Sequence, residues 1–178
     1  MRRSAALALA LALAVPAMAA VPEPEGYRGE PYRAPVPATL EGAVVVDDEA
    51  AYALWWSGAV AFVDVLPRPE RPPDLPEGTL WIDQPHASIP GAIWLPNTGY
   101  RELDPARLAY FLDGLARATG GDRTRPVLLF CKTDCWMSWN AAKRALEHGH
   151  AKVFWYPEGS DGWERAGREL VPVEPVSR

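Results

Sequence analysis

Short apolar runs alternate along the chain with segments whose apolar residues recur at helical spacing. The runs predict strands, and the almost continuous apolar character of two of them, 59–65 and 127–130, is typical of strands covered on both faces. The predicted strands are 43–46, 59–65, 92–95, 127–130 and 152–156. This alternation predicts an α/β domain with a mainly parallel sheet flanked by helices.

Helix-ending residues frame the segments between these strands. Asp47 suits the N-cap of a first helix, which closes near Gly58, and Asp104 suits the N-cap of a second, which ends at Gly120. A third helix is expected over 138–147, and a turn with a short helix over 159–167.

Proline marks two segments that cannot form regular helices. Five prolines between 21 and 37 predict an extended arm over 20–42 that lies outside the core, and seven between 67 and 90 predict a long ordered loop. Within that loop, 79–82 is a candidate short strand. We expect one folded domain over 43–170 and a C-terminal tail over 171–178.

The N-terminus resembles a secretory signal peptide. Arg2 and Arg3 precede an apolar stretch at 5–15, and Ala17-Met18-Ala19 is a cleavage site of the A-x-A type. The stretch is too short for a membrane span. We therefore expect residues 1–19 to be removed and the mature chain to be periplasmic, without a membrane span.

Charge excludes one class of partner. The chain carries 18 Lys and Arg residues against 23 Asp and Glu residues, a formal net charge of −5. Nucleic-acid binding needs a basic face, so we expect no nucleic-acid partner.

The only two cysteines are Cys131 and Cys135, directly after the apolar run 127–130 and before the helix predicted at 138–147. Loop N–H groups and a helix N-terminus can stabilise an anion there. An oxidising compartment permits a disulfide, but a bridge that closes so short a loop removes little chain entropy. Placement for chemistry is therefore favoured over a purely stabilising bridge.

Several motifs, in this order, resemble the rhodanese-like (sulfurtransferase) domain. They are Phe-Val-Asp-Val at 62–65, Ser-Ile-Pro-Gly-Ala-Ile at 88–93, Phe-Cys at 130–131, Glu-Gly-Ser-Asp-Gly-Trp at 158–163 and Ala-Gly at 166–167. The resemblance implies a three-layer rhodanese-like α/β domain with Cys131 at its catalytic position. Two motif positions differ, because Leu66 stands where an Arg is common and Ser88 replaces a His.

The stretch 131–145 together with the signal peptide is also similar to a periplasmic family named for its CXXCW motif. Here three residues rather than two separate the cysteines. That family is associated with pyrroloquinoline quinone (PQQ)-dependent alcohol catabolism. The resemblance implies that context, with a PQQ-dependent dehydrogenase or an alcohol-transport component as a partner.

The loop departs from the rhodanese pattern. In the family it usually runs six residues from the cysteine to an Arg before the helix Ser, whereas here it runs seven and ends on Met137. Seven residues resemble the phosphatase variants, but these hold phosphate with the Arg, which methionine cannot replace. Phosphatase activity is therefore not expected, and efficient thiosulfate sulfurtransfer is less favoured.

In the site predicted from these residues, the two cysteine sulfurs have different roles. Cys131 would be the nucleophile or sulfur carrier, Cys135 the resolving thiol, and loop residues an anion cradle: Lys132, Thr133, Asp134 and Trp136. A small sulfur donor or acceptor, or a protein thiol, would react with it. The pair could equally cycle as dithiol and disulfide, or form a static bridge.

Two alternatives use the same loop. Cys131, Cys135 and Met137 could bind copper, since thiolate and thioether are soft ligands. Otherwise the arm and Trp136 would dock onto a partner without catalysis. No residue pattern implies an organic cofactor.

Neighbouring residues have simpler expected roles. Asp134 suits a helix N-cap and Trp139 a core position. Asp64, at a strand end, is expected to bond loop backbone, and His86 to lie at the surface.

Overall fold

A wholly parallel five-stranded sheet, in the order β1-β6-β5-β2-β4, forms the centre of the computed structural model, which describes residues 20–177. The predicted α/β class is confirmed. Its strands are β1 Val44–Val45, β2 Ala61–Asp64, β4 Ile93–Trp94, β5 Val127–Phe130 and β6 Val153–Tyr156. The predicted signal peptide, 1–19, lies outside the described residues.

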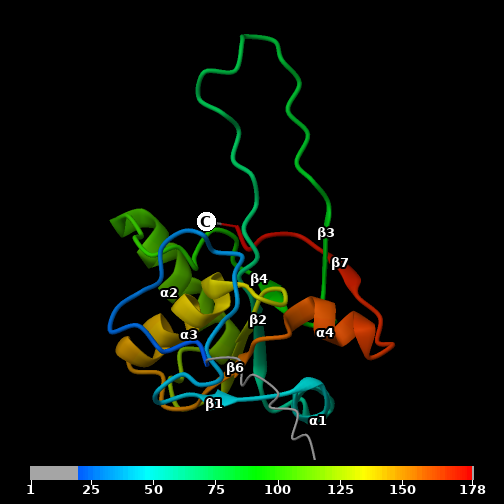
Figure 1. The fold of residues 1–178 in the computed structure, drawn as a ribbon. Helices are drawn as coiled ribbons and strands as arrows, with labels where there is room; N and C mark the ends of the chain where they lie inside the picture. The colour runs from blue at the N-terminus through cyan, green and yellow to red at the C-terminus, as the bar shows by residue number, and fades with distance from the viewer. Residues whose placement is uncertain (1–19, 178) are drawn as a thin grey trace, which may run out of the picture.

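Helices cover both faces of this sheet (Figure 1). Along β5, Val127 and Leu129 pack with α2 and α3, whereas Leu128 and Phe130 pack with α1 and α4. This division explains why β5 is apolar at every position. The helices are α1 Asp48–Ser57, α2 Pro105–Thr119, α3 Trp136–Glu147 and α4 Gly159–Arg165.

The expected caps fix the ends of α1 and α2. The Asp47 carboxylate accepts a hydrogen bond from the Ala50 amide at 2.9 Å, and Gly58 ends α1 in the left-handed conformation. Asp104 accepts from the Arg107 amide at 2.8 Å and begins α2. These caps were predictable because they depend only on neighbours in sequence.

A small second sheet was not predicted. β3 His86–Ser88 pairs antiparallel with β7 Val171–Val173, and Val176 then donates from its amide to the Trp94 carbonyl at 3.0 Å. Within the segment 171–178 that was predicted as a tail, β7 and Val176 thus join the fold. Short strands of this kind are specified by a partner distant in sequence.

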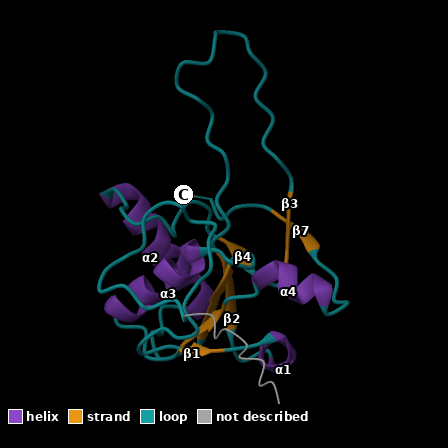
Figure 2. Cartoon of the chain, in the orientation of Figure 1, coloured by secondary structure: helices purple, strands orange, loops and turns teal. Residues whose placement is uncertain are grey.

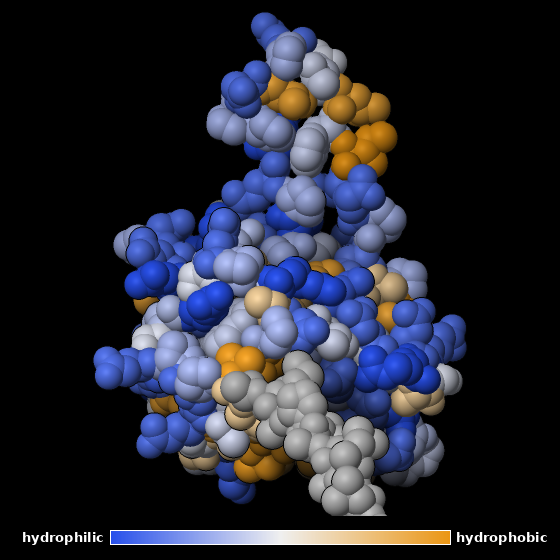
Figure 3. Space-filling model, viewed as in Figure 1, coloured by the Kyte–Doolittle hydropathy of each residue, from blue (hydrophilic) through white to orange (hydrophobic). Residues whose placement is uncertain are grey.

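The segment between β2 and β3 extends away from the body of the molecule (Figure 2). The strand predicted at 79–82 is wrong, because these residues pair with no strand among residues 20–177. Leu80 and Ile82 are 80% and 69% exposed, and apolar side chains gather at the far end of the loop (Figure 3). None of the helices within residues 20–177 has the length and hydropathy to cross a membrane.

The proline-rich arm, 20–42, packs along the body of the domain. Leu40 is buried in the core, and Tyr32, Ala34 and Val36 pack against it. The prediction that the arm lies outside the core was therefore wrong. Its inward residues alternate with the exposed Arg33 and Pro35, a strand-like period that the prolines obscured.

Candidate functional site

The cysteine loop lies at the carboxyl edge of the parallel sheet. Cys131 follows β5 directly, and Cys135 is the N-cap residue of α3. The two are joined in a disulfide with a Cα–Cα distance of 6.2 Å. Cys131 is fully buried and Cys135 is 3% exposed, so the sulfur pair is covered by protein.

A left-handed turn allows this loop to curl. Asp134 has a φ of 55° and is exposed, and Asp is among the few side chains that tolerate that conformation. The predicted N-cap role of Asp134 is wrong, since Cys135 holds that position, and it does so without a capping hydrogen bond from its side chain. Because α3 begins at Trp136, that residue and Met137 belong to its first turn rather than to the loop.

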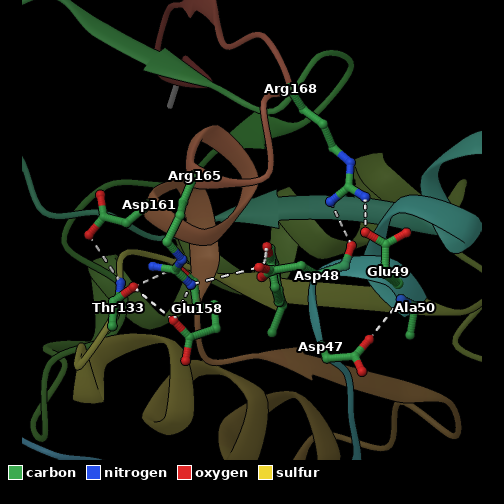
Figure 4. A network of polar contacts seen from close by, with 10 residues as sticks. Asp47, Asp48, Glu49, Ala50, Thr133, Glu158, Asp161, Arg165 and Arg168 are labelled. Carbon is green, nitrogen blue, oxygen red and sulfur yellow. Dashed lines mark hydrogen bonds and ion pairs between the residues drawn. The ribbon is translucent and has the colours of Figure 1, made fainter.

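Acidic side chains from the start of α4 hold the first half of the loop (Figure 4). Asp161 accepts from the Thr133 amide at 3.3 Å and lies 3.6 Å from the Lys132 ammonium. The Thr133 hydroxyl donates to Glu158 at 3.1 Å, to both its carbonyl and its carboxylate oxygen. Arg165 pairs with the same Glu158 carboxylate at 2.8 Å.

Gly159 brings α4 directly against the cysteine backbone. A Cβ at this position would lie 2.3 Å from the Cys131 carbonyl oxygen, and the φ of Gly159 is +53°. The same carbonyl accepts from the Ser160 amide at 2.9 Å. This glycine therefore permits a close approach that any other residue would obstruct.

The arm covers the second half of the loop. The Ala34 amide donates to the Asp134 carbonyl at 3.0 Å, and the Trp136 amide donates to the Tyr32 carbonyl at 2.9 Å. These two bonds pair Arg33 with Cys135 as in an antiparallel sheet. The arm, which was expected to lie outside the core, thus forms one side of the site.

Further contacts fix the arm on α3. The Trp136 indole donates to the Pro35 carbonyl at 3.1 Å, and the Trp139 indole donates to the Thr39 carbonyl at 3.2 Å. Trp139 is fully buried, as predicted, and Trp136 packs edge-on against it beneath the arm. Both indoles therefore serve to anchor the arm.

The four residues predicted to form an anion cradle, Lys132, Thr133, Asp134 and Trp136, are close together, but two of their backbone amides already have acceptors. Thr133 donates to Asp161 and Trp136 to Tyr32, so these N–H groups already have protein acceptors. An anion cradle made of the loop amides alone would have to break these bonds. The site as it stands therefore holds a buried disulfide and a loop in which two of the four cradle amides are already hydrogen-bonded to protein.

Asp64 ends β2, beside Phe130 at the end of β5, and is fully buried. Its carboxylate accepts from the Leu66 amide at 2.8 Å, as expected of a residue that bonds loop backbone. It also accepts from the Ser88 hydroxyl at 2.6 Å and lies 2.8 Å from His86 Nε2. The nearly buried His86 was expected at the surface, and it instead links β3 to the main sheet.

Copper binding would require a change at the two cysteine ligands and another at the methionine ligand. The two sulfurs are bonded to each other, and Met137 is buried in the core. Within residues 20–177, no group of three or more His, Cys, Asp or Glu side chains is placed so that it could hold a metal ion.

Comparison with known proteins identifies the family. Residues 47–166 match the family described as Rhodanese-like domain. No curated protein matches the chain. Similar solved structures include a polysulfide-sulfur transferase homodimer from Wolinella succinogenes, with 21% identity over 73% of this chain and 79% of that one and a TM-score of 0.45.

A second is 3-mercaptopyruvate sulfurtransferase from Leishmania major, with 19% identity over 80% of this chain and 40% of that one and a TM-score of 0.46. The chain thus corresponds to less than half of that enzyme. The family match itself extends over more than half of the present sequence and includes the cysteine loop, α3 and α4. The chain therefore belongs to the rhodanese-like domain family.

Proposed function

We propose that this protein transfers sulfane sulfur through Cys131 and resolves the product with Cys135. Membership of the rhodanese-like family supports sulfur transfer in general. The observation that carries the finer proposal is the disulfide itself, because it puts both sulfurs within bonding reach in one loop at the end of β5. A single-cysteine carrier has no such second sulfur.

The chemistry runs in two steps from the reduced pair. The Cys131 thiolate attacks the outer sulfur of a sulfane donor such as thiosulfate, forms a persulfide and releases sulfite. The Cys135 thiol then attacks the inner sulfur of the persulfide, closes the disulfide and releases hydrosulfide, which carries the thiol proton. The sulfane sulfur is reduced by two electrons, and the two cysteines supply them.

Turnover needs a thiol reductant. Two thiols, or one dithiol, reopen the disulfide by successive exchange and leave as their own disulfide. With an oxidised protein as the resting state, the same pair can run thiol–disulfide exchange without a sulfane donor. The structure holds the oxidised form, which is the product of the sulfur-transfer reaction and the substrate of thiol–disulfide exchange.

The proposed location is the periplasm, and the proposed context is PQQ-dependent alcohol catabolism. The signal-peptide pattern at 1–19 and the similarity of 131–145 to the CXXCW family support them. A PQQ-dependent dehydrogenase or an alcohol-transport component would then be the partner. Fractionation of cells expressing the full chain tests the location, and growth on alcohol of a Cys131→Ser, Cys135→Ser strain tests the context.

No cofactor enters this proposal. Copper binding would require the reduced pair together with Met137, which would have to leave the core. Titration of reduced protein with Cu(I) against a competing chelator tests this rival.

Mass spectrometry of the reduced protein exposed to thiosulfate tests the proposed function. In Cys135→Ser we expect one added sulfur atom on Cys131, because the persulfide cannot be resolved. Wild-type protein should instead lose two hydrogens and release sulfide. Absence of the adduct in Cys135→Ser, or its equal formation in Cys131→Ser, would contradict the proposal.

A further inference from the structure

Arg33 of the arm lies opposite Cys135. The flanking hydrogen bonds, Ala34 to Asp134 and Trp136 to Tyr32, make Arg33 and Cys135 the non-hydrogen-bonded kind of antiparallel pair. In such a pair both side chains project to the same side, with Cβ atoms about 4.5–5.5 Å apart. The Arg33 side chain therefore begins beside the less buried of the two cysteines.

The guanidinium of Arg33 is free to bind a ligand. The residue is exposed, and within residues 20–177 its side chain has no hydrogen bond or ion pair. The other cations around the loop are engaged, since Lys132 pairs with Asp161, and Arg165 with Glu158 and Asp48. Arg28 lies over the Trp136 ring.

We propose that Arg33 binds the anionic group of the sulfur compounds that react with the Cys131–Cys135 pair. The position at which a rhodanese loop would carry an arginine is Met137, buried in the first turn of α3. A planar guanidinium suits a sulfonate or a similar oxyanion, which it can hold by two hydrogen bonds. The inference rests on the proposed function, because it assigns a substrate class to the same disulfide.

Arg33 also selects the sulfur that is attacked. An anionic thiolate held by Arg33 approaches the covered pair from the side of Cys135, attacks the Cys135 sulfur, forms a mixed disulfide with it and releases Cys131 as the thiolate. A second thiolate attacks the sulfur of the bound compound and frees Cys135. Cys131, at the N-terminal side of α3, thus leaves as the thiolate that later accepts sulfur.

Two thiols of similar size test this assignment on the oxidised full-length protein: mercaptoethanesulfonate, which carries a sulfonate, and neutral mercaptoethanol. Rates of disulfide opening are measured by released protein thiol and corrected for the thiolate fraction of each reagent. Arg33→Gln should slow the reaction with the sulfonate thiol about three- to tenfold, the range between an exposed ion pair and a charged hydrogen bond. Mercaptoethanol should be affected less than about twofold.

Arg125→Gln is the matched control. Arg125 is exposed, its side chain forms no hydrogen bond or ion pair within the described residues, and it precedes β5 whereas Cys131 follows it. A four-residue strand separates the two ends by about 13 Å. Arg125→Gln should leave both rates unchanged, and Arg33→Lys should keep part of the sulfonate preference.

Equal slowing with both thiols would assign Arg33 a purely structural role and overturn the proposal, as would an unchanged rate ratio in Arg33→Gln. Added salt should reduce the wild-type preference for the sulfonate thiol, since the contact is exposed. A protein that shows the preference but forms no Cys131 persulfide would refute sulfur transfer and leave the role of Arg33 intact.

Discussion

Replacement of Gly159 by alanine tests how closely α4 approaches the cysteine loop. Gly159 has a φ of +53°, and its Cβ would lie 2.3 Å from the Cys131 carbonyl oxygen and 2.6 Å from the carbonyl carbon. Gly167 supplies a matched control, because its φ is +77° and a Cβ there would have no atom within 4 Å. Gly159 is the first residue of α4 and Gly167 directly follows its C-cap residue, but only Gly159 carries a clash.

The two substitutions separate backbone strain from steric conflict. A non-glycine residue in the left-handed region costs about 1–2 kcal/mol, and Gly167→Ala should lower the free energy of unfolding by about that amount. Gly159→Ala carries the same strain plus about 1–3 kcal/mol for overpacking, since backbone rather than a flexible side chain must move. The expected difference between the variants is therefore about 1–3 kcal/mol.

Urea unfolding of the oxidised proteins, followed by tryptophan fluorescence, measures both values. Comparable slopes with urea concentration would show that the variants differ in stability rather than in the compactness of their end states. If Gly159→Ala were no less stable than Gly167→Ala, the close packing of α4 on Cys131 would be refuted.

Three further predictions concern the disulfide, the buried carboxylate and pH. The double variant Cys131→Ser, Cys135→Ser should lose about 2 kcal/mol of unfolding free energy, because the cysteines are only four positions apart, and a cost above about 4 would contradict the chain-entropy account. Asp64→Ala should cost about 3 kcal/mol in urea unfolding, since three hydrogen-bonding groups lose their acceptor, and an effect below about 1 would contradict it. Burial lowers the pKa of His150, so the folded protein favours the neutral form of this side chain. The stability that His150 contributes should be fully present above about pH 6.5, near its unfolded pKa, and should be lost as the pH falls through the lower folded-state pKa. His150→Gln should flatten this pH dependence of the thermal unfolding temperature.

Local sequence was sufficient for most of the framework. Asp47 and Asp104 cap their helices through bonds to residues three positions on, and β5 is apolar because both faces are covered. Both features depend on the identity of near neighbours. The strand β3, by contrast, is defined by its pairing with β7, more than 80 residues later, which no local pattern encodes.

The two sulfurs of the candidate site were predicted from the sequence, but the arm that covers them was not. The position of Cys131 after an apolar strand placed it at the sheet edge, where the loops after parallel strands converge. The contribution of the arm could not be predicted in this way, because Tyr32 and Trp136 bond through backbone atoms that carry no sequence signal. Only the alternation of inward and outward residues around Arg33 hinted at it.

The packing of Met137 explains why a cation for this site would come from outside the loop. A Cβ on Gly99 would lie 2.4 Å from the Met137 carbonyl oxygen, so the first turn of α3 is pressed against that segment. An arginine at 137 would have to bury its charge among apolar side chains, which is costly without a paired anion. The arm is bonded to the loop on both sides of Cys135, and its one arginine opposite that cysteine is exposed. The two functions are therefore divided between segments: Met137 of α3 fills the core, and Arg33 of the arm supplies the positive charge beside Cys135.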